Sequence, residues 1–441
     1  MKAAWKATNS EIVVEKIKNL GGGNNLCTAE YPALIPRPGR ALYGRSMNSS
    51  RHPQQLLTLS TGTLACSYKY NEVPGVLRIF DMDESEVIGE AFNFAPFSAH
   101  MELKSETDQM RATVFGVDNH TSIVIFENGS GDVVEVFGQK NYMTMHKGSI
   151  VTSGYDENFV HYYPPGDYHY SAEKSRFFII NGRKPNCRGL ASYKSYLVYW
   201  SEECMYQIID GVNPSTFLIA DDIGCISGYT IVNMRGKLIW LDRDGVYEWG
   251  GGMKPQVISG AVAKYVTGLK LSDLVLPPQA IAYGDIYYLT LVPYNGTPVI
   301  LTFDTVHRIW NVETGLAILS FTTLDGKLVG ITPDCTVWTL SGGASEEVVE
   351  WSWLSPPLEP ALKVIVHVEM PHTGAVLRCM AVCDDDEKDA EEITKPPIGG
   401  KWVVPMPVEK VGICSKFQVK LEGEGRVLIK GVETVRRAAK A

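Results

Sequence analysis

A hairpin-like segment recurs along this chain of 441 residues. Residues 235–249 read RGKLIWLDRDGVYEW, and residues 194–208 read KSYLVYWSEECMYQI, so that the two align without a gap. Residues 325–338 read DGKLVGITPDCTVW and follow the same plan, with one more residue in the turn. Each copy has an apolar run, a polar turn and then an aromatic residue. An internal repeat constrains the fold strongly, because every copy is expected to adopt the same local structure.

The repeat has a period of a little over 40 residues. A period of about 40–50 residues that holds four short strands is typical of a β-propeller blade. The apolar runs at 197–200 and 238–241 are apolar on both faces of a strand, as expected for a sheet that packs between two neighbours. The equivalent positions, all in or beside turns, are Gly148, Ser195, Gly236, Gly284 and Gly326, with a fainter candidate at Gly62.

These patterns predict an all-β chain with a β-propeller of about six or seven blades. The alternative is an all-β sandwich whose hairpins resemble one another by accident. We expect an extended N-terminal arm at 1–50, which donates a closing strand or contacts another subunit. The propeller is predicted at 51–342, and a C-terminal antiparallel β-sandwich with a basic tail at 343–441.

The flanking regions carry weaker signals. Residues 8–20 begin with a helix-capping pattern, yet 11–18 fit a strand almost as well. In the C-terminal region, 363–370 and 375–383 predict a hairpin around a His-Thr-Gly turn, and the acidic stretch 384–392 predicts an exposed loop. Residues 416–422 alternate, which predicts that Phe417, Val419 and Leu421 face a core.

Charge is unevenly distributed in this acidic chain, whose net charge is −9. Residues 1–55 hold eight Lys/Arg against three Glu, and residues 409–441 hold eight against four, so the acidic excess lies between them. Such a body is not expected to bind nucleic acid over its whole surface. It is suited to line a channel that a polyanion passes without sticking, although an ordinary solvated surface has the same composition.

The nine cysteines are scattered and include no Cys-x-x-Cys. They predict reduced core residues of a protein made in a cytosol, including Cys379 and Cys383, whose spacing would otherwise suggest half of a metal site. The start of the chain has no apolar run of signal-peptide length, and no run approaches the length of a membrane span.

Common catalytic and nucleotide-binding motifs are absent from the sequence. Asp81 and Asp83 resemble the start of a calcium loop that lacks its later ligands, so a turn is the favoured interpretation. Asp242 and Asp244 have the spacing of an acid–base pair, but Asp-Arg-Asp-Gly is also a common turn sequence. We therefore expect no enzymatic activity and no cofactor.

Two groups of residues are candidate partner contacts. The aromatic loop 161–170 surrounds a Pro-Gly-Asp turn and predicts sugar or partner binding, the alternative being a blade hairpin that packs on its neighbours. The basic residues of the arm form the second group. The candidates are Tyr162, Tyr163, Tyr168 and Tyr170 in the loop, and Arg37, Arg40, Arg45 and Arg51 in and just after the arm.

Three stretches resemble the β-propeller tail-hub or nozzle proteins of tailed bacteriophages, also called packaged-DNA stabilisation proteins. The first combines GGGNN at 21–25 with Arg-Pro-Gly at 37–39. The second runs from 223–233 into 245–249 and 255–259. The third is 416–422 with 429–432. Together they span most of the chain as loose patterns.

The resemblance implies a virion component without catalytic residues. Copies would form a ring, in the family a hexamer, that closes the DNA channel at the tail end and opens during ejection. Partners would be other tail and connector proteins and, transiently, genomic DNA. The alternatives are a glycan-binding or receptor-binding adaptor of the tail tip and, with less support, a propeller glycoside hydrolase, which would need paired carboxylates.

Overall fold

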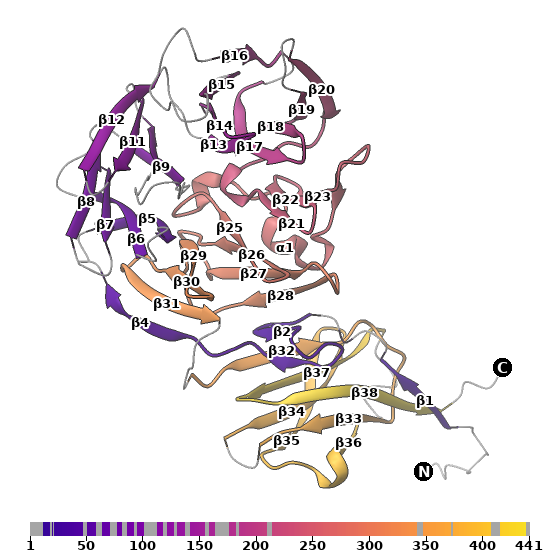
Figure 1. Cartoon of the computed structure of the whole chain (residues 1–441). Coiled ribbons are helices and arrows are strands. Elements are labelled where there is room, and N and C mark those ends of the chain that lie inside the picture. Colours follow the sequence, from indigo (N-terminus) through magenta and orange to yellow (C-terminus); the bar gives the residue numbers. More distant parts are fainter. Residues whose placement is uncertain are drawn as a thin grey trace, which may run out of the picture. The chain divides into compact units, whose positions relative to one another are not determined.

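The computed structural model divides the chain into two compact units, which we describe separately (Figure 1). Unit 1 comprises residues 1–39, 303–314 and 345–441, and unit 2 comprises 40–302 and 315–344. The structure describes 12–17, 20, 22–46, 51–58, 64–70, 77–81, 86–91, 95–100, 113–117, 121–127, 130–136, 142–154, 158–163, 176–181, 185–209, 214–341, 347–371, 374–406 and 415–437.

Unit 2 consists of small antiparallel sheets whose strands follow one another in sequence. Four-stranded sheets are formed by β5 (Arg51–Thr58), β6 (Leu64–Tyr70), β7 (Leu77–Asp81) and β8 (Glu86–Ala91); by β13 (Tyr142–His146), β14 (Ser149–Ser153), β15 (Phe159–Tyr163) and β16 (Arg176–Ile179); by β17 (Cys187–Tyr193), β18 (Tyr196–Ser201), β19 (Met205–Ile209) and β20 (Ser215–Ala220); and by β21 (Val232–Met234), β22 (Lys237–Asp242), β23 (Gly245–Trp249) and β24 (Gln256–Val257).

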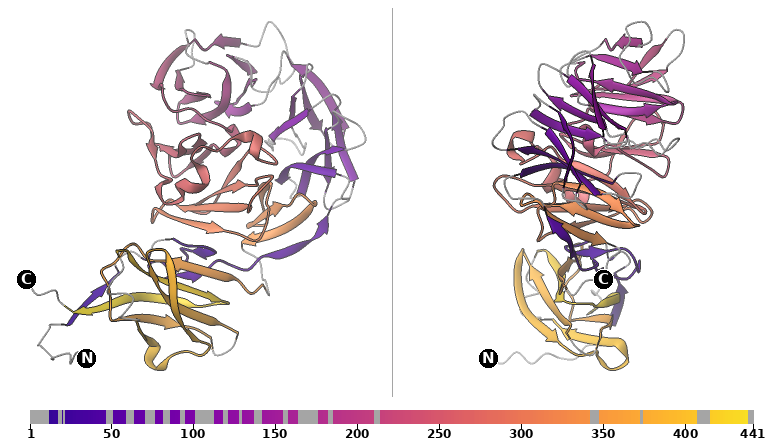
Figure 2. Two further views of the ribbon diagram at one scale, coloured as in Figure 1. Left: turned by 180° about the vertical axis from the view of Figure 1, so that it is seen from behind. Right: turned by 60° about the vertical axis from the view of Figure 1, so that its left-hand side comes forward.

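The remaining strands of unit 2 continue this plan. They are the pairs β9 (Ala95–His100) with β10 (Thr113–Val117) and β11 (Thr121–Glu127) with β12 (Ser130–Val136), then β25 (Gln279–Tyr283), β26 (Ile286–Leu291) and β27 (Val299–Asp304), and finally β29 (Ser320–Leu324), β30 (Lys327–Ile331) and β31 (Thr336–Ser341). Figures 1 and 2 show these sheets set side by side around a common centre. The predicted β-propeller is therefore confirmed.

The repeated segment begins at the turn between the first two strands of a blade and runs through the second and third strands, as Arg235-Gly236, β22 and β23 do in 235–249. In five blades two residues join the first and second strands, between the pairs His146↔Ser149, Tyr193↔Tyr196, Met234↔Lys237, Tyr283↔Ile286 and Leu324↔Lys327. Both turn residues have positive φ in Arg235-Gly236, at 48° and 74°, which is the requirement of the type I′ turn that suits twisted strands. One predicted register position is wrong: the residue equivalent to Gly236 is Asp285, because Gly284 is the first residue of its turn.

These turns also connect neighbouring blades. The Tyr193 hydroxyl donates to the Gly236 carbonyl at 2.5 Å, and the Tyr283 hydroxyl donates to the Gly326 carbonyl at 2.7 Å. Each tyrosine is the last residue of a first strand, and each acceptor lies in the turn of the next blade. The turn that opens the repeated segment therefore also accepts a hydrogen bond from the preceding blade.

Apolar cores lie between successive sheets. The indoles of Trp200 in β18 and Trp240 in β22 are fully buried, with ring centroids 5.3 Å apart. They belong to a cluster that joins the β17–β20 sheet to the β21–β24 sheet. Since both faces of these central strands are covered, the apolar runs of the sequence do not alternate.

The propeller is closed by a strand from the N-terminal region. β4 (Ala41–Ser46) pairs antiparallel with β31, so that the last sheet has the order β29-β30-β31-β4. The first and last blades also meet, because the Leu56 amide donates to Ser320 Oγ at 2.9 Å. Leu56 and Leu64 share one core cluster with Val329 and Ile331. Residues 41–46 of the expected arm thus serve as a closing strand within the same chain.

Unit 1 is an antiparallel β-sandwich. One sheet has the order β1 (Ile12–Lys16), β38 (Leu428–Arg437), β33 (Lys363–Glu369) and β36 (Lys401–Pro405). The other has the order β32 (Glu350–Leu354), β37 (Phe417–Glu424), β34 (Val376–Cys383) and β35 (Asp386–Ile393). Phe417, Val419 and Leu421 are buried in the shared core, as their alternation predicted.

Three local predictions for unit 1 are corrected or settled. β33 and β34 do not form a hairpin, because they lie in different sheets and pair with β38 and β37 instead. The acidic stretch 384–392 is not a loop, since most of it is strand β35, whose charged side chains suit a sheet edge. Residues 12–16, for which the sequence allowed either a helix or a strand, form β1, which pairs with β38.

We predict that removing the inter-blade hydroxyl contacts destabilises the propeller. Tyr193→Phe and Tyr283→Phe should each cost about 1 kcal/mol, or about 2 °C in the midpoint of thermal unfolding, because each leaves a carbonyl without its donor. Tyr196→Phe is the matched control, since no hydrogen bond of its hydroxyl is found among the described residues. Equal midpoints for all three variants would contradict the prediction.

Candidate functional site

The segment at 22–25 runs beside two strands of unit 1. The Asn24 amide donates to the Ser352 carbonyl in β32 at 2.9 Å, and the Ser352 amide returns a bond to the Asn24 carbonyl at 3.1 Å. On its other side, the Asn25 amide donates to the Val312 carbonyl in β28 (Ile309–Glu313) at 2.7 Å. The N-terminal segment therefore joins two strands that are far away in sequence.

The glycines of this segment are required by space. A Cβ on Gly22 would lie 1.5 Å from the Trp310 carbonyl oxygen, and one on Gly23 would lie 2.4 Å from the Ser352 carbonyl oxygen. Any side chain at either position would force the backbones apart. The glycine run at 21–23, which sequence alone marks only as a break, is thus explained in part by close backbone packing.

Arg37 holds the same segment through a buried guanidinium group. Its Nη2 lies 2.9 Å from Glu347 Oε1, and its Nε lies 3.7 Å from Glu313 Oε2. The Nε also donates to Asn25 Oδ1 at 3.3 Å. The side chain is 4% exposed, so its partners are groups of its own chain.

A second polar cluster fixes residues 28–31. The Asp304 carboxylate accepts hydrogen bonds from the Thr28 hydroxyl and from the backbone amides of Val306 and His307. His307 Nδ1 lies 2.8 Å from Asp304 Oδ2, and the Tyr31 ring stacks on the imidazole with centroids 4.2 Å apart. Although burial opposes ionisation, these hydrogen bonds hold the pKa of Asp304 below its usual value.

The predicted partner contacts do not come together as one surface. Arg37 and Arg40 are 5% and 3% exposed, and we do not carry them forward as contacts with another molecule. Tyr162 in β15 is half-buried and packs against an apolar cluster of unit 2, which fits the alternative of a packed hairpin. Arg45, Arg51 and Tyr163 lie in β4, β5 and β15, but their side chains are outside the described residues, as are Tyr168 and Tyr170 entirely.

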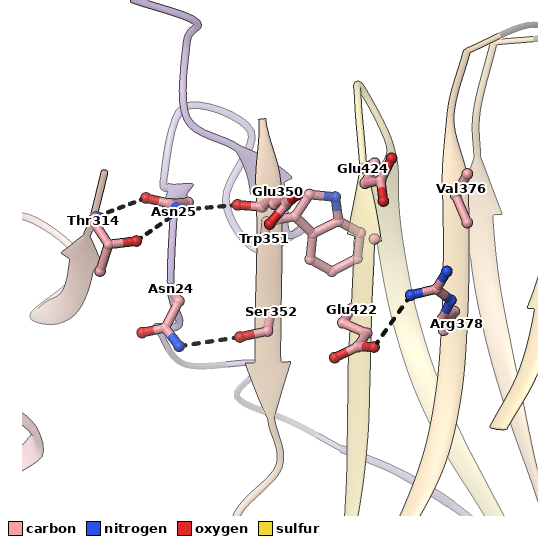
Figure 3. Close-up of a pocket in the computed structure, with 11 residues that line it drawn as sticks. Asn24, Asn25, Thr314, Glu350, Trp351, Ser352, Val376, Arg378, Glu422 and Glu424 are labelled. Carbon is pink, nitrogen blue, oxygen red and sulfur yellow. Dashed lines mark hydrogen bonds and ion pairs between the residues drawn. The ribbon is translucent and has the colours of Figure 1, made fainter. Parts of the chain in front are cut away.

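Unit 1 has a polar pocket that the sequence did not reveal (Figure 3). Its volume is about 370 Å³, within the usual range for ligand sites. The side chains that line it come from the 24–25 segment, residue 314 and three adjacent strands. They include Asn24, Asn25, Thr314, Glu350, Ser352, Arg378, Glu422 and Glu424.

Strand register explains the pocket. Glu350 in β32 lies opposite Glu424 in β37, and Ser352 lies opposite Glu422. Arg378 in β34 lies opposite Glu422 on the other side. Residues opposite one another share a face of the sheet. The only sequence signal was the outward position of Glu422 in the alternating stretch, because the other residues meet through pairing of distant strands.

The aspartates at 242 and 244 lie in different surroundings. Asp242 is 2% exposed, and its Oδ2 accepts a hydrogen bond from the Gly224 amide at 3.3 Å. Asp244 is exposed in the two-residue turn between β22 and β23. Burial raises the pKa of Asp242 to about 6. The turn interpretation agrees with this geometry.

The thiols of Cys187 and Cys379 are buried. Burial raises the pKa of the Cys187 and Cys379 thiols to about 12, so neither is a thiolate at neutral pH. In the described part of the chain, no three His, Cys, Asp or Glu side chains are arranged to bind a metal ion. No helix in that part is both long and apolar enough to cross a membrane.

The sequence matches no protein-family model and no curated protein. Among solved structures, BBS1N in complex with ARL6DN shares 11% identity at a TM-score of 0.45, covering 71% of this chain and 99% of that one. Raptor from Chaetomium thermophilum shares 10% identity at a TM-score of 0.48, and the match covers 70% of this chain and 29% of that one. BamB from Moraxella catarrhalis shares 12% identity at a TM-score of 0.40, and the match covers 76% of this chain and 100% of that one. Identities this low carry no information about activity.

We predict that Arg37→Met lowers the stability of unit 1 by about 3 kcal/mol, because it removes a buried guanidinium that bonds Glu347 and lies 3.7 Å from Glu313. Hydrogen exchange of the amides at 22–37 should accelerate with the same substitution. Arg378→Met is the control, since that exposed arginine pairs with Glu392 at the surface and should cost less than about 1 kcal/mol. Equal effects of the two substitutions would contradict the structural role of Arg37.

Asp242→Asn should stabilise the protein above pH 6. The folded-state pKa of Asp242 lies above its ordinary value of 3.8, so the folded state binds the proton more tightly and stability falls as pH rises from about 4 to 6. The asparagine variant avoids this loss of stability, which amounts to at most about 3 kcal/mol at pH 7.5. The unmodified protein and the variant should have different midpoints of thermal unfolding at pH 7.5 and similar midpoints at pH 4. A difference between the midpoints that is the same at both pH values would refute the prediction.

Proposed function

We propose that this protein is a structural component of a bacteriophage tail, a subunit of a hub or nozzle ring that closes the DNA channel and retains the packaged genome until ejection. The observation that carries the proposal is the resemblance of three stretches to that family. Support comes from the part those stretches play in the fold. Gly22 and Gly23 permit close backbone packing, Arg37 forms a buried ion pair, and 417–421 supply core residues.

The course of the chain also supports a scaffold role. The polypeptide passes between the two units four times, at 39/40, 302/303, 314/315 and 344/345. The propeller is therefore inserted into unit 1 rather than attached at one end. A subunit whose two parts are linked at several points resists separation under load better than one with a single linker.

Exposed apolar side chains on edge strands support self-association. Phe217 and Leu218 in β20 are 52% and 55% exposed, and Ile12 and Val14 in β1 are 69% and 56% exposed. β20 and β1 each end a sheet, so their outer backbone groups are available to another chain. Apolar residues on such edges are typical of contact surfaces.

On this proposal, the protein is not an enzyme and needs no cofactor. Its partners are further copies of itself, in a ring of about six, other tail and connector proteins and, transiently, genomic DNA in the channel. It is made in the cytoplasm of the bacterial host and resides in the virion tail. The acidic body of the chain suits a channel that DNA must traverse without binding.

A second candidate function is an adaptor or receptor-binding protein of the tail tip. The pocket of unit 1 favours it, because a purely structural ring has no evident use for a polar cavity of this size. The two functions are compatible within one chain. A glycoside hydrolase is the least supported reading.

Assembly in solution tests the ring. We expect the purified chain to form particles of about six copies at high concentration, measured by light scattering after size exclusion and by electron microscopy. Phe217→Asp and Val14→Asp should weaken assembly by placing charge on the exposed edges. Met253→Asp is the matched control, because Met253 is 96% exposed but lies outside β1 and β20. A chain that stays monomeric throughout would overturn the ring.

A further inference from the structure

The pocket of unit 1 opens on the outward face of the sheet β32-β37-β34-β35. Its side chains stand in two rows across three strands, with Glu350 and Glu424 in the first row and Ser352, Glu422 and Arg378 in the second. Asn24 closes one side and donates to Ser352 Oγ at 3.1 Å (Figure 3). Neighbouring strands lie about 5 Å apart and alternate residues of one strand about 7 Å apart, so a ligand the size of a sugar ring can reach both rows.

Charge in the pocket is not balanced by its own residues. Arg378 bonds Glu392 at 2.7 Å and lies 3.7 Å from Glu422. Glu350 and Glu424 lie opposite each other on paired strands, and among the described residues neither carboxylate has a hydrogen bond, although the charge of Arg378 acts on Glu424. Like charges directly opposite on paired strands are unfavourable. A ligand that donates hydrogen bonds to both carboxylates would relieve this repulsion.

The lining combines donors with acceptors. Three carboxylates and the Asn24 amide oxygen accept hydrogen bonds, while Arg378 and Ser352 donate them. Such a mixture suits a ligand whose polar groups both donate and accept, which is the property of sugar hydroxyls. The Trp351 side chain is 4% exposed and so offers little ring surface for stacking, which leaves recognition to hydrogen bonds.

We propose that this pocket binds a saccharide, with a preference for sugars that carry a free amine and against sugars that carry an acid. Hydroxyl groups donate in pairs to the two facing carboxylates, and an ammonium group offsets their charge. Acidic sugars are excluded, since a further carboxylate would add to the same repulsion. The site lies in unit 1 and does not depend on the proposed ring, so that failure of either leaves the other standing.

Binding of defined oligosaccharides to the full chain tests this inference. The probes are a short glucosamine oligosaccharide, its N-acetylated form and a galacturonic acid oligosaccharide, titrated by calorimetry at neutral pH. We expect affinity to fall in that order, with no detectable binding of the acidic probe. Glu350→Gln and Glu424→Gln should each weaken binding of the glucosamine probe by about tenfold or more, because each removes a charged acceptor.

Two controls keep charge and folding apart from sugar recognition. Glu369→Gln changes an exposed glutamate of the other sheet, which pairs with Lys430, and should leave binding unchanged. Spermidine supplies amines without a sugar. If spermidine binds as tightly as the glucosamine probe, or if the Glu350 and Glu424 variants bind like the unmodified chain while unfolding at the same temperature, the saccharide site is refuted. Cleavage of a probe would refute binding without catalysis.

Discussion

Closure between the two ends of the repeat region is the interaction on which the propeller depends. In a ring of sheets, both faces of every sheet are covered only if the first and the last sheet meet. Here β4 is the outer strand of the last sheet. The Leu56 amide, in the first sheet, donates a hydrogen bond to Ser320 Oγ in the last sheet. Without closure, the cluster around Leu64 and Ile331 would face water, and the loss of that burial would expose two sheets at once.

The N-terminal segment has a comparable part in unit 1. Gly23, Asn24 and Asn25 form backbone hydrogen bonds with β28 and β32, and Arg37 neutralises two glutamates that lie 34 residues apart in sequence. A buried guanidinium with carboxylate partners is costly to disrupt, because removing it leaves charge in a poorly solvated place. The same segment borders the polar pocket, so the residues that stabilise the sandwich also shape its candidate binding site.

The sequence predicted the architecture better than the connections. The segment 235–249 and its copies identified the blades, since the turn that opens it, Arg235-Gly236, has positive φ at both residues and leaves a local signature in glycine. The hairpin predicted for 363–383 was wrong, because alternation fixes which face a residue takes but not which strand lies beside it. The acidic stretch at 384–392 was also misjudged, since charge favours loops and sheet edges alike.

What the sequence determined by itself was local and periodic: the turns, the apolar runs and the alternation of 416–422, all of which depend on neighbours a few residues away. What only the tertiary structure decided was the pairing of distant segments. Arg37 resembles an exposed basic residue in the sequence, and burial by Glu313 and Glu347 gives it a different role. Glu350, Arg378 and Glu424 carry no common signal, yet strand register brings them to one pocket, because hydrogen bonding between strands ignores distance along the chain.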